Sequence, residues 1–498
     1  MYFLGIDIGT SSTKSVLFDE HGTAVASAAH GYVFDVDRIG HAEQDPLVWY
    51  QAVQKTVSEA IHKSGLKKEQ IASIGLSGQM HGTVALDAQG AVVRKAILHC
   101  DVRADQEAAE IRQRFGDRIS KITFNPIFPG FQAVTLCWMR KHEPENYART
   151  SVVITPKDYI RYCLTGEIGS EHTDASAVLL YDMKRSAWSD EIFEMLGLPR
   201  DIVPAEIHAS YEVAGTVTRQ AAELCGLAAG TPVVFGGADQ AMHSIGNGVY
   251  EPGTIMSTIG TSGQVLSASR QAVYNSELNT HTFRHVKEHT YYGLGAVLFA
   301  GTTLNWFRRN FAPDCTFEQL GGLVAAVPPG SEGLLFLPCM GGERTPYLDP
   351  LARGVFDGVT MLHTKAHFAR AIMEGVTFAM KTSIEKVASL YGPCDRFVCA
   401  GGGVKGLTWA QIQADIYNHE ILISHIDEQA CLGAAIMAAV GANAYATIED
   451  ACRAMCDTTM FALRPDPANA ALYQRIYEKI YTRIYKQNAE IFHEMAAI

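Results

Sequence analysis

The chain has 498 residues, more than one hydrophobic core usually holds, which predicts two domains. Hydrophobic residues make up 47% of the chain and charged residues 19%, a composition typical of a folded globular protein. The net charge of −12 argues against nucleic acid or an anionic membrane as the main partner, although a local anion site could still bind a negatively charged substrate.

The sequence predicts a cytoplasmic protein with reduced thiols. The smoothest apolar run, residues 434–440, is too short and too rich in alanine to span a membrane, and no positively charged leader precedes the first apolar segment. The eleven cysteines are scattered without a CxxC motif. Cys452 and Cys456 lie four apart, but no His or Cys pair nearby completes a zinc site.

The opening residues predict a β-hairpin that carries an acid beside a polar turn. Residues 2–8 are an apolar run interrupted by Asp7, and residues 15–18 predict the returning strand. The turn between them is rich in hydroxyl residues, and these together with backbone N–H groups can hold phosphate oxygens. A carboxylate next to phosphate suits Mg²⁺. An ordinary β-turn gives the same pattern, so the hairpin alone leaves both interpretations open.

The remainder of the first half alternates predicted strands and helices. Two predicted strands, residues 71–76 and 96–98, end in the polar loops 77–82 and 99–103, and strand ends are where ligands bind in α/β sheets. A lone histidine such as His81 is more often structural, but a polar loop at a strand end favours a sugar contact. Further strands are predicted at 83–86, 152–154 and 232–235, and helices at 46–61, 133–141, 156–166, 188–196 and 239–245.

The pattern of the opening hairpin is repeated after residue 250. It consists there of an apolar strand predicted at 254–259, a Gly-Thr-Ser turn and a returning strand predicted at 264–267. Two such hairpins would face each other across one nucleotide. Strands are then predicted at 333–337 and 396–400, and helices at 366–390, 407–417 and 472–492. The tyrosines that recur along the last helix indicate an aromatic packing face rather than a stacking surface for a ligand.

Glycine turns at 9–13, 260–263 and 401–403 each follow an apolar strand, so the three together predict a nucleotide site. Asp239 follows two glycines and opens a helix, where a carboxylate could accept a proton from a substrate hydroxyl. The alternative for Asp239 is a helix N-cap, which aspartate favours strongly. We find no metal-ligand cluster and no Ser-His-Asp set in the sequence.

These motifs together resemble the FGGY family of carbohydrate kinases, and the resemblance covers nearly the whole chain. Residues 5–10 resemble its first phosphate motif and residues 260–263 its second phosphate turn. Residues 77–82 resemble the sugar loop of the members that phosphorylate D-xylulose, and residues 236–239 resemble the segment with the catalytic base. Further matches lie at 125–131, 156–159, 300–306, 354–374 and 401–415.

The resemblance implies an α/β fold in which two ribonuclease-H-like domains of the actin, hexokinase and Hsp70 type flank a nucleotide cleft, here residues 1–246 and 247–498. It implies phosphorylation of a sugar, D-xylulose at its 5-hydroxyl, with ATP and Mg²⁺, and a homodimer is common in the family. The implied catalytic residues are Asp239 as base and Asp7, which also binds the metal. The implied sugar contacts are Gln79, Met80, His81, Asp101, Arg103 and Asp239, and the implied ATP contacts are Thr10, Ser11, Thr13, Gly260, Thr261, Gly301, Asn305, Gly402 and Gly403.

The chain departs from the family pattern at three places. His99-Cys100 stand where Trp-Asn is usual near the sugar, Thr135 stands where Lys is common, and Gly406 stands where Ser or Asn is common near the nucleotide. The first departure leaves open a kinase for another ketose, a polyol or an aldonate. An actin- or Hsp70-like nucleotide switch and a catalytically inactive sugar sensor are the alternatives from other classes.

Overall fold

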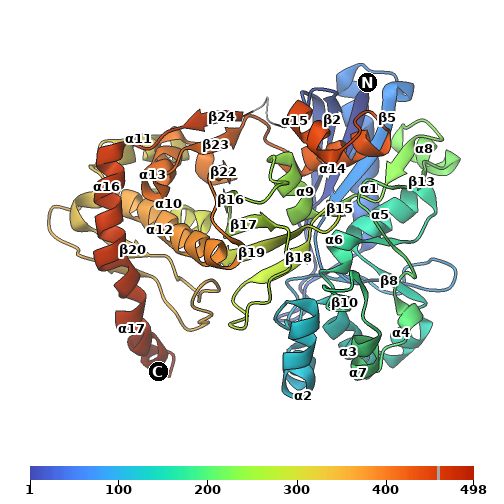
Figure 1. Ribbon diagram of the computed structural model, residues 1–498, viewed down its shortest axis with the longest axis horizontal. Coiled ribbons are helices and arrows are strands. Elements are labelled where there is room, and N and C mark those ends of the chain that lie inside the picture. Colours follow the sequence, from blue (N-terminus) through green and yellow to red (C-terminus); the bar gives the residue numbers. More distant parts are fainter. Residues whose placement is uncertain (457–459, 498) are drawn as a thin grey trace.

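A computed structural model describes residues 1–456 and 460–497 and shows two lobes side by side (Figure 1). The first lobe is built on a mixed sheet in which β1 (Tyr2–Ile8) lies between its hairpin partner β2 (Ser12–Asp19) and the parallel strand β5 (Ile71–Gly78). β3 (Ala24–Gly31) extends the sheet beyond β2. On the other side lie β14 (Pro232–Val234) and β13 (Val213–Thr216), and β15 (Gly237–Ala238) pairs with the end of β5.

The second lobe repeats this plan around β16 (Thr254–Ile259), which lies between its hairpin partner β17 (Gly263–Ser269) and the parallel strand β22 (Arg396–Ala400). The structure therefore confirms the predicted repeat of the opening hairpin, together with the crossover strand that follows it. The sheet is completed by β18 (His281–Arg284), β19 (Tyr291–Val297), β23 (Ile421–Ser424) and β24 (Met460–Leu463).

Helices cover both sheets. In the first lobe α1 (Pro46–Ser64) begins after an Asp45 cap and buries Trp49 with the small apolar residues of one face. The other helices of this lobe are α2 (Asp105–Thr123), α3 (Gln132–His142), α4 (Pro144–Arg149), α5 (Pro156–Thr165), α6 (His172–Ala175), α7 (Asp190–Leu196), α8 (Arg219–Cys225) and α9 (Asp239–Gly246). Short strand pairs add β4 (Glu43–Gln44) to β7 (Ala96–Ile97), β6 (Val84–Leu86) to β8 (Val152–Ile154), β9 (Ser170–Glu171) to β12 (Ile207–His208), and β10 (Tyr181–Asp182) to β11 (Ala187–Trp188).

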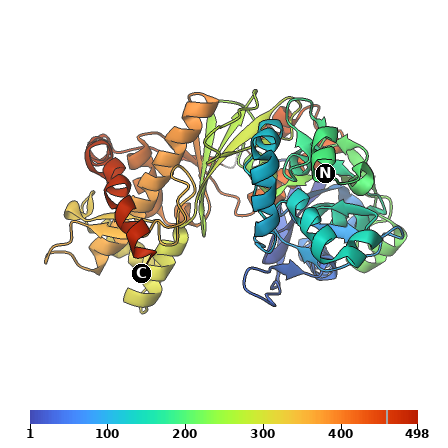
Figure 2. The ribbon, with the colours of Figure 1, turned by 90° about the horizontal axis from the view of Figure 1, so that it is seen from below.

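The second lobe is centred on the long helix α12 (Lys365–Tyr391), which packs against its sheet. Around it lie α10 (Gly301–Phe311), α11 (Phe317–Ala325), α13 (Leu407–Tyr417), α16 (Pro467–Ile476) and α17 (Thr482–Met495), and the strand pair β20 (Leu335–Leu337) with β21 (Val355–Asp357). Figure 2 shows that the strands of residues 263–297 lie on the side of the second lobe that faces the first lobe.

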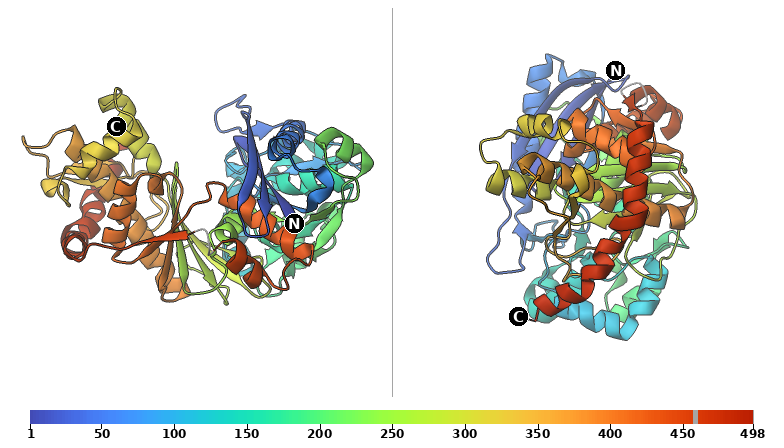
Figure 3. Two further views of the ribbon diagram at one scale, coloured as in Figure 1. Left: turned by 90° about the horizontal axis from the view of Figure 1, so that it is seen from above. Right: turned by 90° about the vertical axis from the view of Figure 1, so that its left-hand side faces the viewer.

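Two helices from the second half of the sequence belong spatially to the first lobe. α14 (Gln429–Gly441) and α15 (Ile448–Met455) lie beside the first sheet (Figures 1 and 3). The approach is so close that a Cβ on Gly5 would lie 1.9 Å from the Cys431 carbonyl oxygen, and a Cβ on Gly433 would lie 1.9 Å from the Met242 carbonyl oxygen. The chain therefore crosses between the lobes more than once.

Most predicted elements are confirmed, and four need correction. The helix predicted from residue 188 begins only after the Ser189 cap, because Trp188 pairs in β11. Residues 77 and 78 extend β5 instead of starting a loop, and residues 331–333 form a 3₁₀ turn, which shortens the strand predicted at 333–337. The predicted C-terminal helix is interrupted by a π-helical turn, Tyr477–Tyr481.

The predicted aromatic packing face of that C-terminal segment is confirmed, since Tyr473, Tyr477 and Tyr481 are buried around Phe378 of α12. The 19-residue helix α2 is absent from our predictions, although its apolar residues Ala108, Ile111, Phe115, Ile119 and Ile122 recur at helical spacing and could have indicated it. In the described part of the chain, no helix combines the length and hydropathy that a membrane-spanning segment needs.

Candidate active site

The turn of the first hairpin presents some of its hydroxyls and buries others. The turn is closed by Gly9 N–H, which donates to the Ser12 carbonyl at 3.0 Å. Thr10 is half-buried and its hydroxyl donates to Gln79 Oε1 at 3.3 Å, while Ser11 is exposed. The Thr13 side chain is fully buried and its hydroxyl pairs with Tyr32 at 3.2 Å. This placement leaves Thr10 and Ser11 available to a phosphate and argues against a direct contact from Thr13.

Asp7 lies on β1 beside the end of β5, where Ser77 Oγ donates to its Oδ1 at 2.6 Å. Burial raises the pKa of Asp7, and the effects of Ser77 and the neighbouring Lys14 only partly offset this. Lys14 is itself paired with Glu428 at 2.6 Å. Among the described residues no three His, Cys, Asp or Glu side chains gather to hold a metal. A cation here would therefore depend on carboxylate, water and phosphate ligands, as Mg²⁺ usually does.

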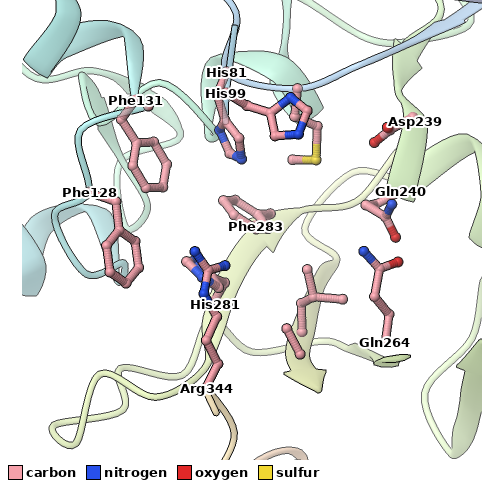
Figure 4. A pocket seen from close by; sticks show the side chains of 14 residues that line it. His81, His99, Phe128, Phe131, Asp239, Gln240, Gln264, His281, Phe283 and Arg344 are labelled. Atoms are coloured by element: carbon pink, nitrogen blue, oxygen red, sulfur yellow. The ribbon is translucent and has the colours of Figure 1, made fainter. Parts of the chain in front are cut away.

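Asp239 is the first residue of α9, and the structure excludes the N-cap alternative. The cap position is Ala238, and no side chain caps this helix end. Because β15 pairs with β5 (Gly237 opposite Ser77, Ala238 opposite Gly78), Asp239 lies near the strand ends that carry Asp7. Its carboxylate faces a pocket rather than the helix terminus (Figure 4).

Two effects raise the pKa of Asp239 to about 7. Burial is the larger effect and the nearby Asp7 carboxylate is the second, while hydrogen bonds from Gln240 lower the pKa by less. A carboxyl group that titrates near neutral pH can accept a proton in one step and release it in the next. The position and the pKa together suit a general base.

The pocket in front of Asp239 has a volume of about 220 Å³ and lies between the lobes. The first lobe contributes Met80 and His81, and the His81 ring packs edge-on against Phe131 with centroids 4.5 Å apart. His81 has a positive φ of 67°, and its Nδ1 lies at hydrogen-bond distance from the Ala177 carbonyl oxygen. The other lining residues are His99, Phe128, Gly130, Gln240, Gln264, His281, Phe283, Leu294, Ala296 and Arg344.

The imidazoles of this pocket are neutral. The pKa of His81 is lowered to about 4 and that of His281 to about 3, mainly by burial and in smaller part by the Arg344 guanidinium. Arg344 packs over the Phe128 ring at 4.9 Å, and Figure 4 shows its guanidinium group at the side of the pocket remote from Asp239. Polar groups therefore lie at both ends of the pocket, with aromatic rings between them.

Three of the predicted sugar contacts lie elsewhere. Gln79 bonds to the hairpin turn at Thr10 and does not line the pocket. Asp101 is buried in a bidentate pair with Arg103, with Nε and Nη2 at 2.9 and 2.8 Å from its Oδ2, and Arg103 pairs further with Glu43 at 2.6 Å. This network holds loop 99–103 in place, so a direct sugar contact from Asp101 or Arg103 is not supported.

A second cavity, of about 890 Å³, lies in the second lobe behind the second hairpin turn. All six predicted residues of this lobe line it: Gly260, Thr261, Gly301, Asn305, Gly402 and Gly403. Here Gly301 N–H donates to the Gly260 carbonyl at 2.8 Å, and a Cβ on Gly301 would lie 2.4 Å from that oxygen. Glycine is therefore required for the chain segments to meet, and the size of the cavity suits an adenosine.

Sequence reasoning missed several residues of the two cavities. Gln240 could have been found from its place beside Asp239. His281, Phe283 and Arg344 could not, because they reach the sugar-sized pocket from the second lobe and follow no motif that indicates a ligand. In the larger cavity the missed residues include Phe317, Met373 and Lys405.

Comparisons with known proteins agree across the chain. The model of the N-terminal domain of the FGGY family of carbohydrate kinases matches residues 2–246, and that of the C-terminal domain matches residues 255–442. The Bacillus subtilis xylulose kinase is 36% identical over 476 residues, which cover 96% of this chain and 95% of that protein. A crystal structure of a "xyloylose kinase" from Brucella ovis has a TM-score of 0.91 and 30% identity, covering 99% of this chain and 100% of that one. The gluconate kinase of Lactobacillus acidophilus also has a TM-score of 0.91, with 26% identity and 99% of each chain covered.

Proposed function

The chain belongs to the FGGY family of carbohydrate kinases, and on that premise we propose that it transfers the γ-phosphoryl group of ATP to the 5-hydroxyl of D-xylulose. The observation that carries this proposal is the Asp239 carboxylate. It faces a sugar-sized pocket lined by both lobes, beside Asp7 and the phosphate hairpin, with a pKa near neutrality. The adenosine-sized cavity of the second lobe supplies the site for the nucleotide.

In the proposed reaction Asp239 takes the proton of the sugar hydroxyl as the oxygen attacks the γ-phosphorus. The bond from that phosphorus to the bridging oxygen breaks, ADP leaves with the bond electrons, and the sugar phosphate forms. Phosphoryl transfer depends mainly on positioning and charge stabilisation, which a base orienting the nucleophile assists. Met80 and His81 hold the sugar against Asp239, and the neutral His81 imidazole can exchange hydrogen bonds with its hydroxyls.

On the nucleotide side we assign the phosphates to Thr10, Ser11 and Thr261 and the adenosine to the glycine turns and Asn305. Asp7 is the residue we propose to hold Mg²⁺, through water, since it is the acid next to the hairpin turn. The ion, when bound, neutralises negative charge on the phosphate oxygens. Closure of the lobes over the two cavities would exclude water, which otherwise competes with the sugar for the phosphoryl group.

An aldonate such as gluconate is the second candidate substrate. The Arg344 guanidinium is a permanent cation in the sugar pocket, and it suits a carboxylate. His99, which stands where the family usually has Trp, also lines this pocket. A nucleotide switch is less favoured, because it has no use for a sugar-sized pocket in front of the base.

A coupled ADP-release assay with a panel of substrates tests the proposal. The panel includes D-xylulose, D-ribulose, xylitol, glycerol and D-gluconate, with Asp239→Asn as the inactive control. We expect the highest kcat/KM with D-xylulose. A higher value with gluconate would identify an aldonate kinase, and no sugar-stimulated ADP release from any compound would refute the proposed activity.

For the organisation of the chain we keep the division into residues 1–246 and 247–498 as a proposal, with α14 and α15 returning to the first lobe. The cytoplasmic location and the homodimer stay predictions. Light scattering on the purified protein would measure the oligomeric state.

A further inference from the structure

A buried ionic cluster lies beside β15, the short strand that ends immediately before Asp239. Lys157 Nζ is 2.7 Å from Asp158 Oδ1, 3.4 Å from Asp174 Oδ2 and 3.7 Å from Glu171 Oε1. Arg161 forms a further ion pair with Asp158. The side chains of all five residues are at most 1% exposed. Two cations and three acids are therefore enclosed in the protein, outside the two cavities.

This cluster bonds to the backbone on both sides of the two glycines that precede Asp239. Lys157 Nζ donates to the Phe235 carbonyl at 3.0 Å. Ala238 N–H donates to Thr173 Oγ1 at 2.8 Å, and the Thr173 hydroxyl in turn donates to Glu171 Oε1 at 2.8 Å. Thr173 is therefore a two-bond bridge from the ionic cluster to the peptide next to the base.

The segment between these anchors is tightly enclosed. Gly236 has a positive φ of 71°, its N–H donates to the Ser210 carbonyl at 2.9 Å, and a Cβ there would lie 2.2 Å from the Leu76 carbonyl oxygen. A Cβ on Gly237 would lie 2.6 Å from Met242 Cε and 3.0 Å from Thr173 Oγ1. Movement of residues 235–238 therefore requires movement of the cluster.

Stability alone gives little reason for such a cluster. Removing charges from water costs free energy that ion pairing often only just offsets, so a buried ion network is weak evidence of stabilisation. This one is also incompletely satisfied, since Asp174 Oδ1 and Arg161 Nε have no hydrogen-bond partner within the described part of the chain. What the network does supply is a fixed geometry for the backbone that it contacts.

We propose that the buried cluster positions the catalytic base, with Thr173 and Lys157 as positioning residues that hold residues 235–238 and thereby the Asp239 carboxylate. This inference rests on the proposed function, in which Asp239 receives the proton of the sugar hydroxyl. Catalytic groups have to be held within about 0.5 Å of their working position. A displacement of about 1 Å can lower a rate about a hundredfold.

The test removes the hydrogen bonds of the Thr173 hydroxyl while keeping the shape of the side chain. Thr173→Val leaves Ala238 N–H without its acceptor, and we expect kcat to fall ten- to hundredfold while the KM for ATP changes less than twofold. Thr173→Ser keeps the hydroxyl and should restore kcat to within about twofold of the unmodified enzyme. Thr173→Cys, which offers a weaker acceptor than Ser, should give an intermediate kcat and serves where the Val variant does not fold.

Thr155 provides a matched control. Its hydroxyl donates within the same cluster, to Asp158 Oδ2 and Asp174 Oδ2, both at 3.0 Å, but forms no bond to residues 235–238. We expect Thr155→Val to lower the melting temperature about as much as Thr173→Val while kcat stays within twofold.

The outcomes separate this inference from the proposed function. Equal kcat losses in the two Val variants, or an unchanged kcat in Thr173→Val or Thr173→Cys, would overturn the positioning role. A failure of Thr173→Ser to restore kcat would also overturn it, because packing rather than the bond would then matter. If Asp239→Asn kept full turnover, the assignment of the base would fall instead, whatever the Thr173 variants do.

Discussion

Replacement of Asp239 by Asn should remove most of the activity and at the same time stabilise the folded protein at neutral and alkaline pH. Loss of a general base typically lowers a rate by 10²- to 10⁴-fold, and we expect a loss of at least about a thousandfold in kcat. Nucleotide binding should be retained, because the larger cavity contains no atom of Asp239. The gain in stability follows from the raised pKa of the carboxyl group.

The magnitude of that gain can be worked from the pKa. Moving a carboxyl pKa from 3.8 to about 7 destabilises the ionised folded state by about 4 kcal/mol, since each tenfold change in the dissociation constant is worth ~1.36 kcal/mol. The side chain borders a pocket and is partly exposed, so solvent screening reduces this, and we expect about 2 kcal/mol. For a domain of this size that corresponds to about 4 °C in melting temperature.

The sign and the pH window follow from proton linkage. Between pH 4 and pH 7 the folded protein binds more protons at Asp239 than the unfolded chain, so the free energy of unfolding falls as the pH rises and then levels off above pH 7. Asn does not titrate. The Asn variant should therefore be more stable than the unmodified protein at pH 8, and its advantage should vanish as the pH falls towards 4.

Thermal unfolding at pH 5, 6, 7 and 8 measures this difference, with the exposed Asp314→Asn as a control that should show no such pH-dependent gain. An Asn variant that is less stable at pH 8, or whose advantage does not depend on pH, would refute the reasoning about Asp239. In the unmodified enzyme, kcat/KM should decline below pH 7 as the base becomes protonated.

Three further predictions concern the metal, the nucleotide and the packing between the lobes. Asp7→Asn should lower turnover at least about a hundredfold, while calorimetry should find the affinity for the sugar nearly unchanged. A loss of sugar affinity together with an unchanged dependence of activity on Mg²⁺ would contradict the assignment of Asp7. Gly406→Phe should raise the KM for ATP at least about tenfold without changing the melting temperature, because a Cβ at Gly406 meets no atom within 4 Å and the ring would enter the larger cavity; an unchanged KM would exclude that cavity as the nucleotide site. Gly433→Ala should lower the free energy of unfolding by about 2 kcal/mol or more, since its Cβ would lie 1.9 Å from the Met242 carbonyl oxygen, and chemical denaturation of a variant as stable as the parent would contradict the observed packing of α14.

Local sequence was sufficient for the two hairpins and for the glycine turns of the larger cavity. A strand and a tight turn are fixed by residues that are neighbours in the chain, so the pattern of apolar residues, glycines and hydroxyls placed Thr10, Gly260 and Gly402 in turns, and the two glycines line the larger cavity. The same holds for Asp239, because the glycines before it and the helix after it are both visible in the sequence. The resemblance to a kinase family arose from such segments.

Pairing between distant segments was decided only in three dimensions. Asp101 and Arg103 stand at a strand end, as a ligand contact would, yet Glu43 and the bidentate pair satisfy their charges. Arg344 and His281 carry no local signal and become site residues only because the second lobe brings them against Met80 and His81. The pKa of Asp239 likewise depends on burial and on Asp7, more than 200 positions away in the chain. Short-range sequence thus determined the turns and the chemistry they can perform, whereas the electrostatics and the shape of the sugar pocket come from long-range packing, which leaves no periodic pattern along the chain.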